Sequence, residues 1–183
     1  MIEPGSPIVT VVLPTRDRKE LVHRALASVT AQTFTDFECV VVDDGSVDGT
    51  AEALRAFHDP RVTVVRSLVS RGAPHARNVG IGRGRGRYVA FLDDDDEWLP
   101  HHLVSHVQRL QGTRRLVATY SAVWIDRNGT ATARVADTDG GRFERLLAFA
   151  WPITTSGIVV DRVEAGAELH FDENLPAMQE LEL

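Results

Sequence analysis

A run of five acidic residues, Asp93-Asp94-Asp95-Asp96-Glu97, is the feature of this sequence with the clearest chemical meaning. It directly follows an apolar stretch at residues 88–92, whose composition predicts a buried β-strand. Carboxylates placed this closely repel one another unless a cation compensates them, and their hard oxygens suit Mg²⁺ or Mn²⁺. A solvated acidic loop is the alternative, and the buried strand before the run makes it the weaker interpretation.

Polar residues also follow two other predicted strands. Asp43-Asp44-Gly45-Ser46 comes after the apolar stretch 37–42, and Pro14-Thr15-Arg16-Asp17-Arg18 comes after the stretch 8–13. Ligands of open α/β sheets bind beyond the carboxyl ends of the strands, so all three polar segments are expected at one edge. Turn formation and helix capping explain either of these two segments when it is taken alone.

Alternating strands and helices are predicted to position these residues. In the first half, strands are expected at 8–13, 37–42, 61–66 and 88–92, and helices at 17–32, from 48 onward and at 73–81. Such alternation predicts parallel strands joined by right-handed crossovers, with Asp17 and Asp48 as helix caps. The second half is predicted to be mixed, with helices at 99–110 and 143–149, strands at 116–125, 130–135 and 153–160, and a hairpin turn at Asn128-Gly129.

Length and composition restrict the classes of protein to consider. The chain has 183 residues, 43% of them apolar, which fits one globular domain. Its net charge of −6 disfavours a general nucleic-acid surface, and its one cysteine excludes an intrachain disulfide framework. No apolar run reaches the roughly 18 residues of a membrane span, and the N-terminus lacks the pattern of a signal peptide. A cytoplasmic enzyme is therefore expected.

Three weaker signals receive structural interpretations. The glycines of residues 80–84 follow a predicted helix rather than opening one, so they indicate a helix end and not a dinucleotide loop. The arginines of residues 83–87 form one short tract in an acidic chain, and no nucleic-acid partner is expected. His102 and His106 lie one helical turn apart; a zinc pair is the alternative to surface or packing histidines, which we favour.

Several of these segments together resemble glycosyltransferase family 2, the inverting enzymes of the GT-A fold. The matching stretches are residues 11–18, 28–38, 42–50, 72–80 and 91–100, with a fainter match at 171–175. The resemblance implies an α/β fold, a Rossmann-like three-layer α/β/α sandwich with a mostly parallel central sheet. It also implies a nucleotide-sugar-binding half at residues 1–100 and a partial acceptor-side half at 101–183 of a single domain.

The resemblance assigns roles to individual positions. Thr15, Asp43 and Asp44 are expected to hold the base and ribose of a nucleotide-sugar, and Arg71 and Arg77 to lie near the base or diphosphate. Asp93, Asp94 and Asp95 occupy the family's Asp-X-Asp motif, with Asp95 as the principal ligand of Mn²⁺ or Mg²⁺ and Asp93 as the second. The full set of expected donor-binding residues is Pro14, Thr15, Arg16, Asp43, Asp44, Arg71, Arg77, Asp93 and Asp94.

The catalytic base is expected near the end of the chain. Family members carry a Glu-Asp pair there, whose Asp takes the proton of the acceptor, whereas this sequence has Gln179-Glu180. Glu180 is therefore the expected base, with Glu182 as the alternative. Residues 178–183 begin a helical pattern that no cap or breaker closes, so we expect the chain to be a shortened form.

These features predict a metal-assisted inverting glycosyltransferase that uses a nucleotide-sugar, with UDP- and dTDP-sugars favoured. The expected acceptor is a hydroxyl group, with a glycan, a lipid-linked sugar and a small molecule left open, and the expected setting is cell-wall or polysaccharide biosynthesis. The expected location is the cytoplasm, and peripheral attachment to the inner face of the membrane stays open. The alternative is a nucleotide-binding module, or a truncated and inactive glycosyltransferase-like protein.

Overall fold

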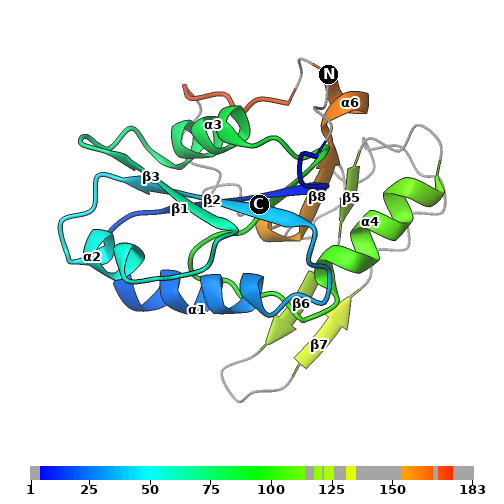
Figure 1. Ribbon diagram of the computed structural model, residues 1–183, viewed down its shortest axis with the longest axis horizontal. Coiled ribbons are helices and arrows are strands. Elements are labelled where there is room, and N and C mark those ends of the chain that lie inside the picture. Colours follow the sequence, from blue (N-terminus) through cyan, green and yellow to red (C-terminus); the bar gives the residue numbers. More distant parts are fainter. Residues whose placement is uncertain are drawn as a thin grey trace.

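A six-stranded sheet forms the centre of the computed structural model, which describes residues 5–113, 118–120, 122–125, 131–134, 154–166 and 169–174. The strand order is β3-β2-β1-β4-β8-β5 (Figure 1). The strands are β1 (Val9–Thr15), β2 (Phe37–Asp44), β3 (Val62–Ser67), β4 (Tyr88–Phe91), β5 (Ala118–Tyr120) and β8 (Ile158–Asp161). The first four run parallel, and β8 lies antiparallel between β4 and β5. The predicted mostly parallel sheet is confirmed.

Helices cover both faces of the sheet. The helices are α1 (Lys19–Thr30), α2 (Thr50–Arg55), α3 (Ala73–Arg83), α4 (His102–Gly112) and α6 (Arg162–Ala165). Because side chains of a strand alternate between the two faces, Val11 and Leu13 of β1 join a core cluster with α1 and α4, while Val12 joins a cluster on the opposite face. Figure 1 shows α1 and α2 below the sheet and α3 above it, which gives the predicted three layers.

Helix α3 lies very close to β1 because glycine occurs where the two elements meet. A Cβ atom added at Gly80 would lie 2.4 Å from Val12 Cγ1, and one at Gly86 would lie 2.4 Å from the backbone nitrogen of Thr10. The helix ends at Arg83, so the interpretation of residues 80–84 as a helix end is confirmed. Gly80 thus permits the close packing of α3 on the sheet, and Gly86 permits a close approach to β1 by the connection between α3 and β4.

The second half differs from its prediction in two places. The single strand expected at 116–125 is two strands, because β5 joins the central sheet whereas β6 (Ala122–Ile125) pairs with β7 (Ala131–Arg134) in a separate hairpin. The strand expected from residue 153 begins as a 3₁₀ turn, η1 (Thr155–Gly157), before β8. The turn at Asn128-Gly129 and the helix expected at 143–149 lie outside the described residues.

The caps of the first two helices also differ from the prediction. Asp17 does not cap α1, whose N-cap is Arg18; its backbone has φ = 51°, and its Oδ1 instead accepts a 2.7 Å hydrogen bond from Val47 N. The N-cap of α2 is Gly49 and not Asp48, although Asp48 Oδ1 accepts a hydrogen bond from the backbone nitrogen of Thr50, the first residue of α2. Within the described residues, no helix is long and apolar enough to cross a membrane.

Candidate functional site

The carboxyl ends of β1, β2 and β4 bring the three polar segments together, as the sequence predicted. Thr15 is the register partner of Asp43 across the β1–β2 pair. On the other side, Thr15 Oγ1 donates a 2.7 Å hydrogen bond to Asp94 Oδ2, in the acidic run that follows β4. Because Thr15, Asp43 and Asp94 are all buried, this contact belongs to the framework of the site.

Asp44 fixes the loop between β3 and α3 over the end of β2. Its carboxylate accepts hydrogen bonds from Ser70 Oγ at 2.6 Å, Arg71 N at 3.0 Å and Gly72 N at 2.8 Å. The loop passes so close that a Cβ at Gly45, where φ is +78°, would lie 3.0 Å from the backbone nitrogen of Ser70. Asp44 is buried, so in this structure its carboxylate holds the protein's own backbone in place.

Asp43 makes a turn in the same region. Its Oδ1 accepts from Ser46 N at 2.9 Å, and its Oδ2 lies 3.3 Å from Nε of Arg66. Turn formation therefore accounts for the hydrogen bond from Ser46, and the second carboxylate oxygen of Asp43 pairs with Arg66 of β3.

Arg16 joins the same group of loops, since its Nη1 donates to Ser70 Oγ at 2.9 Å while the side chain stays largely exposed. Pro14 is buried within β1, as the register partner of Val42.

Arg18 is the cation that compensates the middle of the acidic run. Its Nη1 lies 2.9 Å from Asp94 Oδ1 and 2.6 Å from Asp95 Oδ2. Burial raises the pKa of the Asp94 carboxyl, and the Thr15 hydroxyl and the Arg18 charge oppose that shift. One guanidinium thus holds two neighbouring carboxylates that would otherwise repel each other.

Arg77 compensates the charge of Asp93. This arginine is buried, projects from α3, and places Nη2 2.5 Å from Asp93 Oδ1. The backbone nitrogen of Asp93 donates to Ser156 Oγ at 2.9 Å, which ties the start of the acidic run to η1. Burial also raises the pKa of Asp96 nearby, with the Ser156 hydroxyl opposing the shift.

The acidic run still presents oxygen atoms to solvent. The side chain of Asp95 is 48% exposed and that of Asp93 is 27% exposed, whereas that of Asp94 is 8% exposed. Within the described part of the chain, no three His, Cys, Asp or Glu side chains are grouped to hold a metal ion on their own. Mg²⁺ in nucleotide sites is held by one or two carboxylates together with substrate phosphates. Asp95 and Asp93 fit that kind of shared site.

His102 and His106 pack against their neighbours, one of which is Trp98. The indole of Trp98 is stacked on the ring of His102 at 4.3 Å, and its Nε1 donates to the carbonyl of Ser156 at 2.7 Å. His106 is buried, with Nδ1 2.6 Å from Thr119 Oγ1. Cys39 is likewise buried, and burial raises the pKa of its thiol to about 12. The packing interpretation of His102 and His106 is confirmed.

Comparison with known proteins places this arrangement in a family. Residues 10–161 match the family described as Glycosyl transferase family 2, which is most of the chain. This chain belongs to glycosyl transferase family 2. The fold and the resemblance predicted from the sequence are thereby confirmed.

Relatives of this family 2 chain include enzymes of polysaccharide biosynthesis. It is 32% identical over 187 residues to the amylovoran biosynthesis glycosyltransferase AmsB of Erwinia amylovora, covering 95% of this chain and 62% of the relative. It is 24% identical over 155 residues to the UDP-Glc:alpha-D-GlcNAc-diphosphoundecaprenol beta-1,3-glucosyltransferase WfaP of Escherichia coli, covering 85% of this chain and 61% of the relative. The family 2 chain spans about half the length of the curated relatives it matches, from 31% to 62%.

A solved structure shows the same fold. The mannosyltransferase PcManGT from Pyrobaculum calidifontis, in complex with GDP-Man and Mn²⁺, superposes with a TM-score of 0.70 at 22% identity. The similarity covers 94% of the family 2 chain and 49% of that protein. The GT-A architecture is thus common to both chains.

Sequence reasoning on this family 2 chain missed two residues that build the site. Arg18 was part of a motif but received no role, although the need of the acidic run for a cation pointed to a basic residue at a neighbouring strand end. Ser156, which bonds the start of the run, carried no comparable signal, because nothing in the sequence places η1 beside β4. Glu180 and Glu182 lie outside the described residues.

Proposed function

We propose that this chain binds a UDP- or dTDP-sugar and transfers its sugar, with inversion, to an acceptor hydroxyl. The observation that carries the proposal is the gathering of three polar strand ends at one edge of the sheet, with Asp95 half exposed among buried carboxylates. Family membership supports it, as does the WfaP relative, whose name states a UDP-Glc donor. Residues 1–100 form the donor-binding half in this proposal, and residues 101–183 belong to the acceptor side.

The donor-binding roles follow from exposure and charge. Arg71 and Arg16 are the exposed cations beside the site, and we assign them to the diphosphate or base. We assign Thr15, Asp43 and Asp44 to the base and ribose, and the bonds described above hold these side chains in place. Asp95, with Asp93, would hold a Mn²⁺ or Mg²⁺ ion, which when bound neutralises charge on the departing nucleoside diphosphate. The Mn²⁺ ion bound in PcManGT supports the use of a divalent metal.

Transfer requires a base on the acceptor side. A sugar hydroxyl is a weak nucleophile, so a carboxylate, for which we propose Glu180, accepts its proton as the oxygen attacks the anomeric carbon. The bond from that carbon to the diphosphate oxygen breaks on the opposite face, which inverts the centre. We place the reaction in polysaccharide biosynthesis because the name of the AmsB relative states that setting.

Calorimetry with UDP, dTDP and GDP, each with and without Mn²⁺, tests the donor site. We expect UDP or dTDP to bind more tightly with Mn²⁺, and Asp95→Asn to weaken that binding at least about tenfold by removing a charged ligand. Asp36→Asn is the matched control, since Asp36 bonds the backbone of Ile8 at the opposite end of the strands. Absence of nucleoside diphosphate binding in every metal condition would contradict the donor-site assignment.

Turnover separates an enzyme from a nucleotide-binding module. Glu180→Gln should slow transfer by ~10²–10⁴-fold, the usual contribution of a general base, and leave UDP affinity unchanged. Normal turnover in that variant would remove Glu180 from the mechanism. Nucleotide binding without any sugar transfer or donor hydrolysis by the wild-type protein would favour the binding-module alternative.

A further inference from the structure

The segment of residues 169–174 is docked on helix α3, far from it in the sequence. Asn78 provides the attachment, because its Oδ1 accepts from Phe171 N and its Nδ2 donates to Phe171 O, both at 2.8 Å. One side chain thus satisfies both backbone groups of Phe171, much as a neighbouring strand would. Figure 1 shows this segment, coloured orange-red, running along α3.

The ring of Phe171 anchors the same segment against the donor half. It meets the ring of Phe91 edge to face, with centroids 5.2 Å apart, and Phe91 is the last residue of β4. The guanidinium of Arg77 lies 5.4 Å from the Phe171 ring while it bonds Asp93. The docked segment is therefore in contact with the side chain that holds the acidic run.

Glu173 closes the attachment from the other side. Its carboxylate lies 3.1 Å from Arg71 Nη2, 3.1 Å from His75 Nδ1 and 3.1 Å from Asn78 Nδ2. The hydrogen bonds from Asn78 and His75 lower the pKa of Glu173, so it stays ionised at neutral pH. We call these four residues, Arg71, His75, Asn78 and Glu173, the Glu173 clasp.

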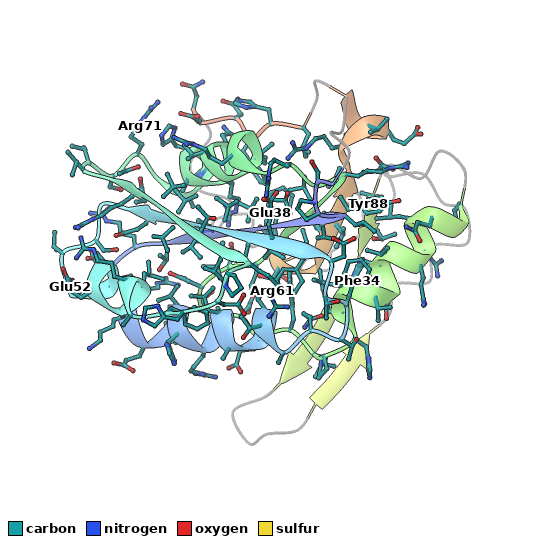
Figure 2. All side chains as sticks on the ribbon, in the orientation of Figure 1. Phe34, Glu38, Glu52, Arg61, Arg71 and Tyr88 are labelled. Atoms are coloured by element: carbon teal, nitrogen blue, oxygen red, sulfur yellow. The ribbon has the colours of Figure 1, made fainter. Side chains whose placement is uncertain are left out.

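The Glu173 clasp also reaches the loop that Asp44 fixes. The backbone nitrogen of Arg71 donates to Asp44 at 3.0 Å, and the Arg71 side chain extends to Glu173. Figure 2 shows Arg71 at the left of the molecule, at the opposite end from Tyr88, which begins β4. Arg71 thus lies at the carboxyl ends of the strands, where the acidic run is, and links the loop between β3 and α3 to the docked segment.

We propose that Glu173 is a positioning residue. It fixes the docked segment to the loop between β3 and α3, so that the residues that follow present the base, Glu180, to the donor. This inference rests on the proposed function. Glu180 follows Asn174 by six residues, and six extended residues span at most about 20 Å. Fixing Asn174 beside α3 therefore restricts the volume that the Glu180 carboxylate can search.

Hydrogen exchange and kinetics together test the role of Glu173. In Glu173→Ala, we expect the amide of Phe171 to exchange at least tenfold faster and kcat to fall about tenfold. The UDP dissociation constant should stay within twofold of wild type, because Asp44 still holds the backbone of Arg71 at the site without Glu173. Asp172→Ala is the matched control, because Asp172 bonds only within its own turn among the described contacts, to Asn174. That control should leave both measurements unchanged.

Glu173→Gln provides a rescue arm. Glutamine keeps an oxygen that accepts from Asn78 but loses the charge that attracts Arg71, so kcat should lie between those of wild type and Glu173→Ala. This variant also keeps the inference testable if Glu173→Ala does not fold. The positioning role would be overturned if kcat fell equally in Glu173→Gln and Glu173→Ala while the amide of Phe171 exchanged at the wild-type rate.

Two further results distinguish the possible failures. If the wild-type protein is active and both Glu173 variants keep the wild-type kcat, the positioning role of Glu173 is overturned and the proposed function is not affected. Loss of UDP affinity in Glu173→Ala with unchanged kcat would also overturn the positioning role, since the residue would then act on donor binding. Absence of sugar transfer by the wild-type protein would overturn the proposed function and the positioning role with it.

Discussion

Substituting Gly80 by alanine tests how closely α3 must approach the sheet. Alanine is favoured over glycine in a helix by up to about 1 kcal/mol, so propensity alone predicts stabilisation. The new Cβ, however, would lie 2.4 Å from Val12 Cγ1, 3.2 Å from Cγ2 and 3.3 Å from Cβ. Val12 is fully buried and stiff at χ1, so it cannot turn away. Overpacking of this kind costs about 1–3 kcal/mol, and we expect Gly80→Ala to lower the free energy of unfolding by about 1 kcal/mol.

Gly82→Ala is the control, because the same helix offers open space there, with nothing within 4 Å of the added Cβ. It receives the propensity gain without the clash, so the two variants should differ by about 1–3 kcal/mol in free energy of unfolding. Urea unfolding measures this difference directly. Displacing α3 also displaces Arg77, so Gly80→Ala alone should weaken UDP binding. Equal stability of Gly80→Ala and Gly82→Ala would refute the close approach of α3 to β1.

Two other predictions concern buried polar groups. Burial lowers the pKa of His102 to about 3 and of His106 to about 4, from 6.5, so stability is fully present above pH 6.5 and is lost as the pH falls toward 4. Each histidine contributes up to about 1.4 kcal/mol per pH unit, and His106→Asn should therefore show a smaller loss between pH 7 and 5 in urea unfolding; an unchanged slope would contradict this. Thr15→Val removes the donor to buried Asp94 and should destabilise the fold by about 1–3 kcal/mol, measured in the same way, whereas wild-type stability would show that the bond contributes nothing.

The first half of the fold could be predicted because its signals are local. Residues Val9–Thr15 are buried on both faces, and such strands appear in the sequence as continuous apolar runs. Parallel order then follows from the alternation with helices, and the position of Asp44 and Asp95 at one edge follows from parallel order. The gathering of these polar residues at one edge could thus be predicted before the side-chain contacts were known.

The remaining features depend on contacts between distant segments. The split of residues 116–125 into β5 and β6 is decided by β8, which enters the sheet between β4 and β5 from about 40 residues further along the chain. Asn78 looks like an ordinary helix residue, and its bonds to Phe171 appear only when the segment 169–174 is in place. Arg18 could be recognised as a counter-ion only once its distance to Asp94 was known.

The attachment of β8 has a consequence for protein engineering. Tyr88 of β4 pairs with Asp161 of β8, whose carboxylate bonds Arg87, and Arg162 donates to the carbonyl oxygens of Gly84 and Ile81. Helix α4, which ends at Gly112, is anchored through Leu103, Val107 and Leu110 in the core cluster, so both ends of the stretch between α4 and η1 are attached to the scaffold. Chimeras that exchange this cassette between relatives should fold, provided that each insert supplies an edge strand in place of β5.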